Sequence, residues 1–492
     1  MLPVFRLLRI GLVVIWLIAL ASAAPQLAGL AKVAVAPPVV SSWRGLAQAV
    51  LFFPLLILLS VAWEQSKATR ITDALLLMAA IAYAYFPAPF FDYIWDVFLI
   101  ETTFVFLLSQ VLQQNPRTKR WALWPLRLLL FRLMFSMGVI KFFGGMPEWR
   151  DGTAMVYFWA NQPMPGYLAW HAAQLPLAWQ QAMGFFVFLA ETPGPLLIFC
   201  GRRARVVFFL LNLILQLGIF VSGNYGFFNL LTIVLCISLF EEREAQNALS
   251  SSANFRMPLQ RGRTLALRVA QNFLFVVLFG WLICSAYYQY AVFRTDTQHL
   301  PETSWVFLQN REQREMPAPL MRLLQSYAAA KIANPYALFG HIAKYRMEIE
   351  IWGSHDAASW KKYRFRVKPD EITRAPIWYA PHHWRLDHQF YYESFRLRAP
   401  QIAAQYSFFL GSRWLPNFAR ALFQNDAGVL SLLRQNPFAE KPSRYLRFAY
   451  LYYAFTNKTE HKATAAYWKT EPPHPGQFFD QPFTAEELDR IR

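Results

Sequence analysis

Long apolar runs separated by short polar turns fill the first 290 residues, after which the pattern changes to that of a water-soluble sequence. An apolar run must continue for about 20 residues to cross a bilayer as a helix. Runs of this kind occur at residues 5–24, 45–63, 72–89, 97–113, 124–143, 183–200, 205–221, 226–241 and 266–289. The pattern therefore predicts a polytopic α-helical membrane protein with about nine spans.

The later residues predict a mixed domain. Apolar and polar side chains alternate over residues 345–352 and again over 360–367, with turn-forming residues between them, which is typical of a β-hairpin. Helical spacing of apolar residues follows at residues 386–397, 414–423 and 445–454. We expect a soluble α+β domain that contains a β-sheet or a small sandwich and whose helices come after its strands.

These patterns divide the chain into regions. Residues 1–290 form the multi-span membrane domain, and its segment 144–182 is long enough to fold into a cap outside the bilayer. Residues 291–344 form a polar connector with a helix around 317–331, and residues 345–492 form the soluble domain.

Arginine and lysine are concentrated in alternate loops of the membrane domain. The loops concerned are residues 67–70, 117–120, 202–205 and 256–268. Because cytoplasmic loops carry the excess of basic residues, the N-terminus is predicted in the cytoplasm and the soluble domain on the other side. Arg6 and Arg9 before the first apolar run also fit a cleavable signal peptide, but the chain stays apolar as far as Val40, which favours an uncleaved first span.

Composition agrees with a membrane protein, since 55% of the residues are hydrophobic, 16% are charged and the mean hydropathy is +0.22. The net charge of +18 is high, but many of the basic residues stand in short loops between apolar runs, where they meet lipid headgroups. The chain has no zinc-finger spacing and no RNA-binding signature. We therefore expect the lipid bilayer, and no nucleic acid, as a partner.

Redox and metal chemistry have no support in the sequence. The three cysteines, Cys200, Cys236 and Cys284, lie in apolar runs and form no CxxC pair. Histidines gather at residues 382–388, but their spacing is not that of a zinc site. We expect neither a metal nor a cofactor.

Ionisable residues inside predicted spans are candidates for function, because a charge is costly to bury in a bilayer. Glu101 and Lys141 stand at similar depths and are expected to pair, unless Lys141 reaches the headgroups. The functional alternative is that burial frees the Lys141 amine to act as a base or nucleophile. Glu191 precedes a Thr-Pro-Gly-Pro sequence that must interrupt its helix, so it is expected to line a cavity or to meet Arg132 or a facing amide.

Several motifs, in the same order, resemble those of the lipase maturation factor family. In the membrane half they are residues 129–135 with Gly138-Val139-Ile140-Lys141, Trp149-Arg150-Asp151, Gln162-Pro163-Met164-Pro165, the turn after Glu191, Ser222-Gly223-Asn224 and Asn229-Leu230-Leu231-Thr232. In the soluble half they are residues 349–354 with Trp360, Ala380-Pro381-His382 with Arg385-Leu386-Asp387, and Asn436-Pro437-Phe438. The likeness extends from about residue 90 to 455.

The resemblance implies a membrane-anchored maturation or folding factor of the secretory pathway, chaperone-like, whose client is a secreted protein such as a lipase and which has no established reaction. Many eukaryotic members have cysteines around the Trp-Arg-Asp motif, where this chain has Glu148 and Ala154, so a thiol-based role is not expected. The short loops look bacterial, which would place the chain in the inner membrane with its soluble domain in the periplasm. In a eukaryote the membrane would be that of the endoplasmic reticulum.

Residues 138–141 and Trp149 are also similar, more weakly, to the membrane domain of vitamin K-dependent gamma-carboxylases, in which a lysine after a comparable motif is catalytic. That similarity implies the alternative function, a membrane-embedded enzyme that uses Lys141 beside Glu101 and Glu191. The second lysine position of that family is Ile140 here, so carboxylation itself is not expected.

For the maturation function, client or ligand binding is expected at polar and aromatic residues of the cap, the outer turns and the soluble domain. They are Trp149, Arg150, Asp151, Gln162, His171, Asn224, Arg385 and Asp387.

Overall fold

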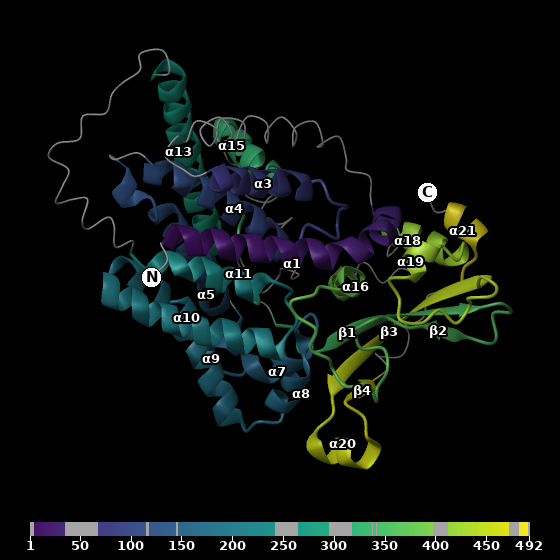
Figure 1. Cartoon of the computed structure of the whole chain (residues 1–492). Helices are drawn as coiled ribbons and strands as arrows, with labels where there is room; N and C mark the ends of the chain where they lie inside the picture. The colour runs from purple at the N-terminus through teal and green to yellow at the C-terminus, as the bar shows by residue number, and fades with distance from the viewer. Residues whose placement is uncertain are drawn as a thin grey trace.

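The structure is a computed structural model of the whole chain, and it describes residues 4–34, 67–114, 118–143, 146–241, 264–294, 317–336, 338–340, 342–396, 412–471 and 482–490. Figure 1 shows its two main parts, a bundle of long helices and a sheet with short helices around it. The N-terminus lies at the end of the bundle that is far from the sheet (Figure 1).

Each predicted span that falls on described residues overlaps a helix. These helices are α1 (Val4–Val33), α3 (Lys67–Tyr83), α4 (Ile94–Gln114), α5 (Trp124–Phe143), α9 (Leu177–Glu191), α10 (Arg202–Ser222), α11 (Phe228–Cys236) and α13 (Thr264–Arg294). In this part of the chain four helical segments are long and apolar enough to cross a membrane, namely Val4–Val33, Ile94–Gln113, Leu177–Phe199 and Arg202–Ser222. The predicted span at 45–63 lies outside the described residues, so the count of nine stays a prediction.

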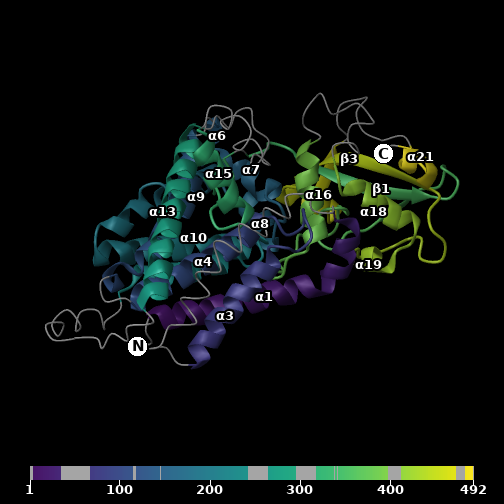
Figure 2. The ribbon, with the colours of Figure 1, turned by 90° about the horizontal axis from the view of Figure 1, so that it is seen from above.

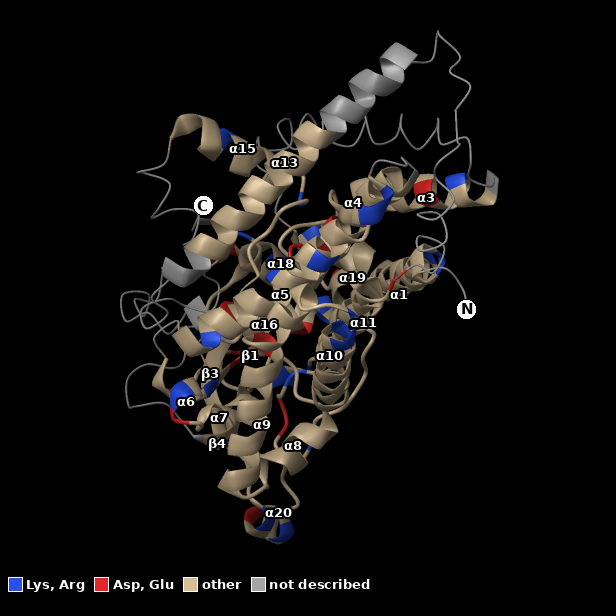
Figure 3. Ribbon diagram, turned by 90° about the vertical axis from the view of Figure 1, so that its left-hand side faces the viewer, with Lys and Arg blue, Asp and Glu red and all other residues tan. Residues whose placement is uncertain are grey.

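The sequence of α10 shows how such a helix fits a bilayer. Leu210, Ile214 and Leu217 follow one another at helical spacing and are 44% to 59% exposed. Asn212 and Gln216 lie on the other side of the helix and are buried. The apolar face is therefore the one that contacts lipid, and Figure 3 shows similarly long uncharged stretches along α9 and α13.

Short helices connect α5 to α9, and Figure 1 shows two of them beside the strands. They are α6 (Pro147–Arg150), α7 (Ala154–Asn161) and α8 (Tyr167–Ala173). Pro165 forms an antiparallel bridge with Gly223, which joins this segment to the end of α10. Short 3-10 helices complete the bundle at Lys119–Trp121 (η1), Gly194–Phe199 (η2) and Ile237–Leu239 (η3).

The sheet has the strand order β2-β1-β3-β4, with every neighbouring pair antiparallel. Its strands are β1 (Arg346–Ser354), β2 (Lys361–Tyr363), β3 (Tyr445–Phe455) and β4 (Trp468–Glu471). Ile351 lies opposite Tyr363, so the predicted hairpin is confirmed. Helix α16 (Arg385–Arg396) packs on β1, which gives the soluble half its mixed character.

The helix predicted at 445–454 is wrong, because these residues form β3, a central strand of the sheet. Nearly every residue of Tyr445–Phe455 is apolar or aromatic, so the helical spacing was accidental. Aromatic side chains favour strands, and pairing with β1 on one side and β4 on the other decides the outcome. The expected order of strands followed by helices is wrong for the same reason.

The second half has five further helices among the described residues, and the sequence predicts two of them. The five are α15 (Ala318–Ala329), α18 (Leu415–Phe423), α19 (Ala427–Leu430), α20 (Lys458–Thr464) and α21 (Ala485–Arg490). Helices α15 and α18 confirm the predictions at 317–331 and 414–423, and α16 confirms the one at 386–397.

Helix α1 joins the two halves. Its 30 residues extend over about 45 Å, more than a span requires, and Figure 2 shows it running from the bundle to α19. A Cβ on Gly29 would lie only 2.2 Å from the carbonyl oxygen of Gly428, so glycine is needed at this contact. One cluster of buried apolar residues continues through both halves.

Candidate functional site

Two buried ion pairs lie inside the bundle, and each uses a side chain of α5. Arg132 pairs with Glu101 of α4, whereas Lys141 pairs with Glu191 at the end of α9. No more than 5% of any of these side chains is exposed. The expected pairing of Lys141 with Glu101 is therefore wrong, and the carboxylate of Glu191 meets neither Arg132 nor a facing amide.

Helical phase explains the actual pairing. Arg132 and Lys141 are nine residues apart, which is about two and a half turns of an α-helix. Their side chains therefore leave α5 on opposite faces, one toward α4 and the other toward α9. Similar depth in the membrane does not bring two residues together when the helix turns one of them away.

Glu101 is the centre of the first cluster. Besides Arg132, its carboxylate accepts hydrogen bonds from Trp281 Nε1 at 2.9 Å, Asn334 Nδ2 at 3.0 Å and Tyr336 Oη at 2.6 Å. The Arg132 guanidinium also lies over the rings of Trp281 and Tyr336, 5.3 and 5.1 Å from their centroids. The cluster fixes α4, α5, α13 and the segment after α15 to one another.

The Gly-Val-Ile-Lys motif joins α5 to the end of α9. A Cβ on Gly138 would lie 2.4 Å from the Glu191 carbonyl oxygen and 2.6 Å from Thr192 Oγ1. Gly138 and Lys141 share a face of the helix, so one admits the neighbouring backbone and the other binds its carboxylate. Helix α9 ends at Glu191 and η2 begins at Gly194, which confirms the predicted interruption.

The Trp-Arg-Asp motif lies beside the ion pair of Lys141 and Glu191. Trp149 is buried, its ring centroid is 5.5 Å from Lys141 Nζ, and its Nε1 donates to the Phe339 carbonyl at 2.8 Å. Arg150 and Asp151 are exposed. Asp151 Oδ1 accepts bonds from Thr153 N–H at 2.9 Å and Thr153 Oγ1 at 2.6 Å. The motif thus presents a buried ring and two accessible charges.

Gln162 is buried where the end of α7 meets the sheet. Its Oε1 accepts from Tyr225 Oη at 2.9 Å, and its Nε2 is 3.3 Å from the Ser222 carbonyl. Arg346, the first residue of β1, donates to the Gln162 carbonyl at 2.5 Å and to the Pro163 carbonyl at 2.8 Å. The sequence analysis did not identify Arg346. An arginine at the start of a predicted buried strand indicates a paired, functional position, because arginine is rarely buried without a partner.

Asn224, just after α10, uses its whole amide to bind the soluble half to the bundle. Nδ2 donates to the carbonyls of Met164 at 3.2 Å and Ile377 at 2.9 Å. Oδ1 accepts from the backbone N–H groups of Tyr379 at 2.7 Å and Ala380 at 3.0 Å. Asn224 is 1% exposed, so no part of its amide is available to a client in this arrangement.

Arg385 links the two halves through its guanidinium and its backbone. Its guanidinium donates two hydrogen bonds of 2.9 Å to the carboxylate of Asp96, in the first turn of α4, and one of 2.7 Å to Tyr83 Oη. The Arg385 backbone N–H also donates to Gln26 Oε1 of α1 at 3.0 Å. Asp96 thus belongs to this junction, whereas Asp92 binds Lys331.

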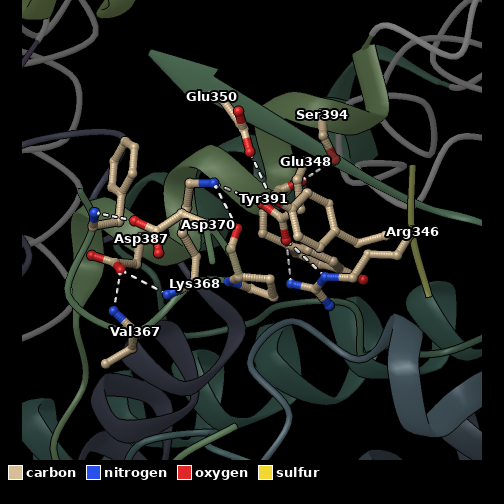
Figure 4. A network of polar contacts seen from close by, with 12 residues as sticks. Arg346, Glu348, Glu350, Val367, Lys368, Asp370, Asp387, Tyr391 and Ser394 are labelled. Atoms are coloured by element: carbon tan, nitrogen blue, oxygen red, sulfur yellow. Dashed lines mark hydrogen bonds and ion pairs between the residues drawn. The ribbon is translucent and has the colours of Figure 1, made fainter. Parts of the chain in front are cut away.

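Asp387 holds the loop before α16, as Figure 4 shows. Its Oδ1 accepts from the backbone N–H groups of Val367 at 2.7 Å and Lys368 at 2.9 Å. Complete burial raises the pKa of Asp387 to about 6, although these two N–H groups act in the opposite direction. Lys368 in turn binds Glu348 at 2.9 Å, and Glu348 binds Arg346, so the junction extends into β1.

Two histidines are buried beside these residues. His388 has one ring nitrogen 3.0 Å from the Trp384 carbonyl and the other 3.1 Å from the Asn224 carbonyl. Burial lowers its pKa to about 3. The ring of His383 lies 4.0 Å from that of His388, centroid to centroid, and the His383 backbone N–H donates to Ser22 Oγ at 2.9 Å. Within the described residues no cluster of three or more His, Cys, Asp or Glu is arranged to hold a metal ion.

The arrangement divides the expected client-binding residues in two. Trp149, Gln162, Asn224, Arg385 and Asp387 are buried at the junction between bundle and sheet and bind other parts of the same chain. Arg150, Asp151 and His171 are exposed, the last with its ring packed on Tyr167 and Trp170. Chemically, the buried set fixes the orientation of the sheet over the ends of the helices.

Comparisons with known proteins agree with the two halves seen here. The family described as the lipase maturation factor transmembrane domain matches residues 50–247, and the lipase maturation factor C-terminal domain matches residues 332–474. No solved structure matches the chain.

Curated relatives resemble most of the chain. Lipase maturation factor 2 of Gallus gallus is 29% identical over 458 residues, which cover 76% of this chain and 63% of that protein. Lipase maturation factor 1 of Homo sapiens is 29% identical over 84% of this chain and 71% of its own length. Lipase maturation factor 2 of Xenopus laevis is 26% identical over 79% of this chain and 66% of its own. The chain thus spans less than two thirds of two of these relatives, and its apolar helices together with matches in both halves show that it is an integral membrane protein of the lipase maturation factor family.

Proposed function

We propose that this protein is a membrane-anchored maturation factor for secreted proteins such as lipases. Support comes from relatives that are named lipase maturation factors and that resemble both halves of the chain. The membrane would be a bacterial inner membrane with the C-terminal half in the periplasm, or the endoplasmic reticulum membrane in a eukaryote. The basic residues in alternate loops of the sequence favour this orientation.

The observation that carries the proposal is the buried junction. Arg385, Asn224 and Arg346 bind the soluble half to three different parts of the bundle. A factor that holds a client at the membrane needs its binding surface in a fixed orientation, because a rigid surface loses less entropy when it binds. The buried residues would act by positioning that surface, and exposed Arg150 and Asp151 would contact the client.

The alternative function, an enzyme that uses Lys141, has less support. The Lys141 amine is bound by the carboxylate of Glu191 and lies beside the Trp149 ring. An amine engaged in this way is not free to act as a base or nucleophile, so the pair favours a structural role.

Secretion of an active client tests the proposal. A lipase and this chain are expressed together in cells that lack a lipase maturation factor, and secreted lipase activity is divided by the amount of secreted lipase. The protein should raise this ratio above that of an empty vector. The double variant Arg150→Ala, Asp151→Ala should lower it while leaving the abundance and melting temperature of the protein unchanged. Lys361→Ala, at the exposed first residue of β2, is the matched surface control. A ratio equal to that of the vector would contradict the proposal.

A further inference from the structure

An exposed tryptophan stands where the soluble half meets the lipid-facing side of the bundle. Trp378 is 49% exposed, and its Nε1 donates to the Phe220 carbonyl in the last turn of α10 at 2.7 Å. The two rings pack edge to face with centroids 5.5 Å apart. The indole is thus attached to the outer end of a span and still open to its surroundings.

Apolar exposure is continuous from the span to this residue. Leu217 and Val221, four residues apart on α10, are 44% and 42% exposed, and they continue the lipid-facing stripe that contains Ile214. Ile377, next to Trp378, is 38% exposed. The soluble half therefore prolongs the face of α10 that contacts lipid.

A second group of exposed apolar residues begins at the same level. The N–H of Gly166 donates to the carbonyl of Ser222, the last residue of α10, at 2.8 Å, so α8 starts where that span ends. In the first turn of α8, Tyr167 and Leu168 are 43% and 48% exposed.

Tyr467 connects this group to the segment that carries Trp378. Its ring centroid is 6.3 Å from that of Tyr167, and its backbone N–H donates to the Ile372 carbonyl at 3.0 Å. Ile372 is itself 45% exposed. The half-buried Tyr467 thus connects the exposed apolar residues of α8 to those of the segment 372–378.

We propose that the segment 372–378 and the first turn of α8 rest in the headgroup region of the outer leaflet, so that the soluble half is itself a membrane-surface domain. The partner is the same lipid bilayer that contains α10. Tryptophan and tyrosine suit this region because the ring is apolar and one atom is polar. The proposal depends on α10 as a span and not on any client, so it can fail while the maturation function stands.

Lipid contact can be measured with a fluorophore whose quencher is in the bilayer. The exposed Cys200 is first replaced by serine, which leaves the buried Cys236 and Cys284. A single cysteine is then placed by Ile377→Cys or Leu168→Cys and labelled with a nitrobenzoxadiazole group. Lys361→Cys, at the exposed first residue of β2, is the matched control. The full chain is reconstituted in phosphatidylcholine nanodiscs with or without lipids that carry a nitroxide near the headgroup.

Labels at 377 and 168 should be quenched by the nitroxide lipid at least about twofold more than the label at 361, and should be protected from aqueous iodide. Equal lipid quenching at the three positions would overturn the proposal. Iodide quenching at 377 that matches position 361 would also overturn it, because the segment would then face water or await a protein partner. If the label at 377 disturbs folding, the full chain labelled at 168 is compared with Trp378→Phe and Trp378→Glu. Only the charged variant should lower the quenching of the label at 168 by the nitroxide lipid, and equal quenching in the two variants would overturn the proposal.

Discussion

The guanidinium of Arg385 and the carboxylate of Asp96 form a bidentate pair across the junction, with both N–O distances 2.9 Å and neither side chain exposed. The two residues are 289 positions apart in the chain. Tyr83 closes the arrangement, because its hydroxyl donates to Asp96 at 2.7 Å and accepts from Arg385. The first turn of a span and the first turn of a soluble helix are thus held together by a bidentate, fully buried charge pair.

Removal of one partner from this pair should weaken the whole junction. We expect Asp96→Asn or Arg385→Met to cost about 3 to 5 kcal/mol, because each leaves a buried charge without its partner. Melting temperature in detergent measures the loss. Lys469→Met breaks the exposed pair with Glu460 and should cost no more than about 1 kcal/mol. Equal melting temperatures for the two kinds of variant would show that the junction does not support stability.

Asn224→Asp should release the soluble half from the bundle. Aspartate keeps the acceptor for Tyr379 but loses the two donors and places a charge against the carbonyls of Met164 and Ile377. The cost of such a buried mismatch is about 1 to 3 kcal/mol. Limited proteolysis between the halves should become faster. Asn457→Asp is the control, because aspartate caps a helix such as α20 as well as asparagine does; faster cleavage in both variants would point to a general effect.

Gly138→Ala should separate α5 from α9. The added methyl would lie 2.4 Å from the Glu191 carbonyl oxygen, and overpacking of this kind costs about 1 to 3 kcal/mol. Gly218→Ala on α10 has nothing within 4 Å of its Cβ and should leave the protein unchanged or slightly more stable. The melting temperatures of the two variants measure the difference in stability. Similar values would mean that the contact at Gly138 can relax.

Much of the bundle could be predicted, because a bilayer requires long apolar runs and the sequence displays them. The ion-pair partners inside the bundle were harder to predict. The depths of Glu101 and Lys141 were read from their distance to the helix ends, whereas the pairing depends on which face of α5 each residue occupies. The nine-residue separation of Arg132 and Lys141 contains that information, so a helical projection would have assigned them to different neighbours.

The junction could not be predicted from local pattern. Arg385 and Asp96 carry no signal of each other in one sequence, and Asn224 is polar in a turn, where polar residues are ordinary. The prediction of a helix in place of strand β3 was wrong for another reason. Its aromatic residues fit both periods, and only its neighbours β1 and β4 select the extended form. Tertiary contacts decided both cases.

A lower pH should change the stability of the junction through two adjacent residues, His388 and Asp387, whose effects have opposite signs. The pKa of His388 is lowered to about 3 from 6.5, so its contribution to stability is present above pH 6.5 and is lost as the pH falls toward 3. The pKa of Asp387 is raised to about 6 from 3.8, so its contribution is present below pH 3.8 and is lost as the pH rises through 6. Between these limits each acts with a slope of about 1.4 kcal/mol per pH unit.

The two variants should therefore respond to acid in opposite ways. Relative to the parent, His388→Gln should lose less stability between about pH 6.5 and pH 4.5, and Asp387→Asn should lose more. Melting temperatures recorded across this range give the two slopes. Parallel curves for parent and variants would show that neither group changes its protonation in the folded junction.

The buried pair of Lys141 and Glu191 allows stability to be separated from chemistry. Lys141→Met alone leaves the Glu191 carboxylate unpaired and should cost about 3 to 5 kcal/mol. The double variant Lys141→Met, Glu191→Leu removes both charges at similar volume and should recover most of that loss, since an apolar pair replaces a buried ion pair at little cost. If the pair is structural, the double variant also recovers client secretion at matched abundance. A stable double variant that secretes no active client would instead assign the amine or the carboxylate a chemical role, and the scaffold interpretation of the pair would have to be abandoned.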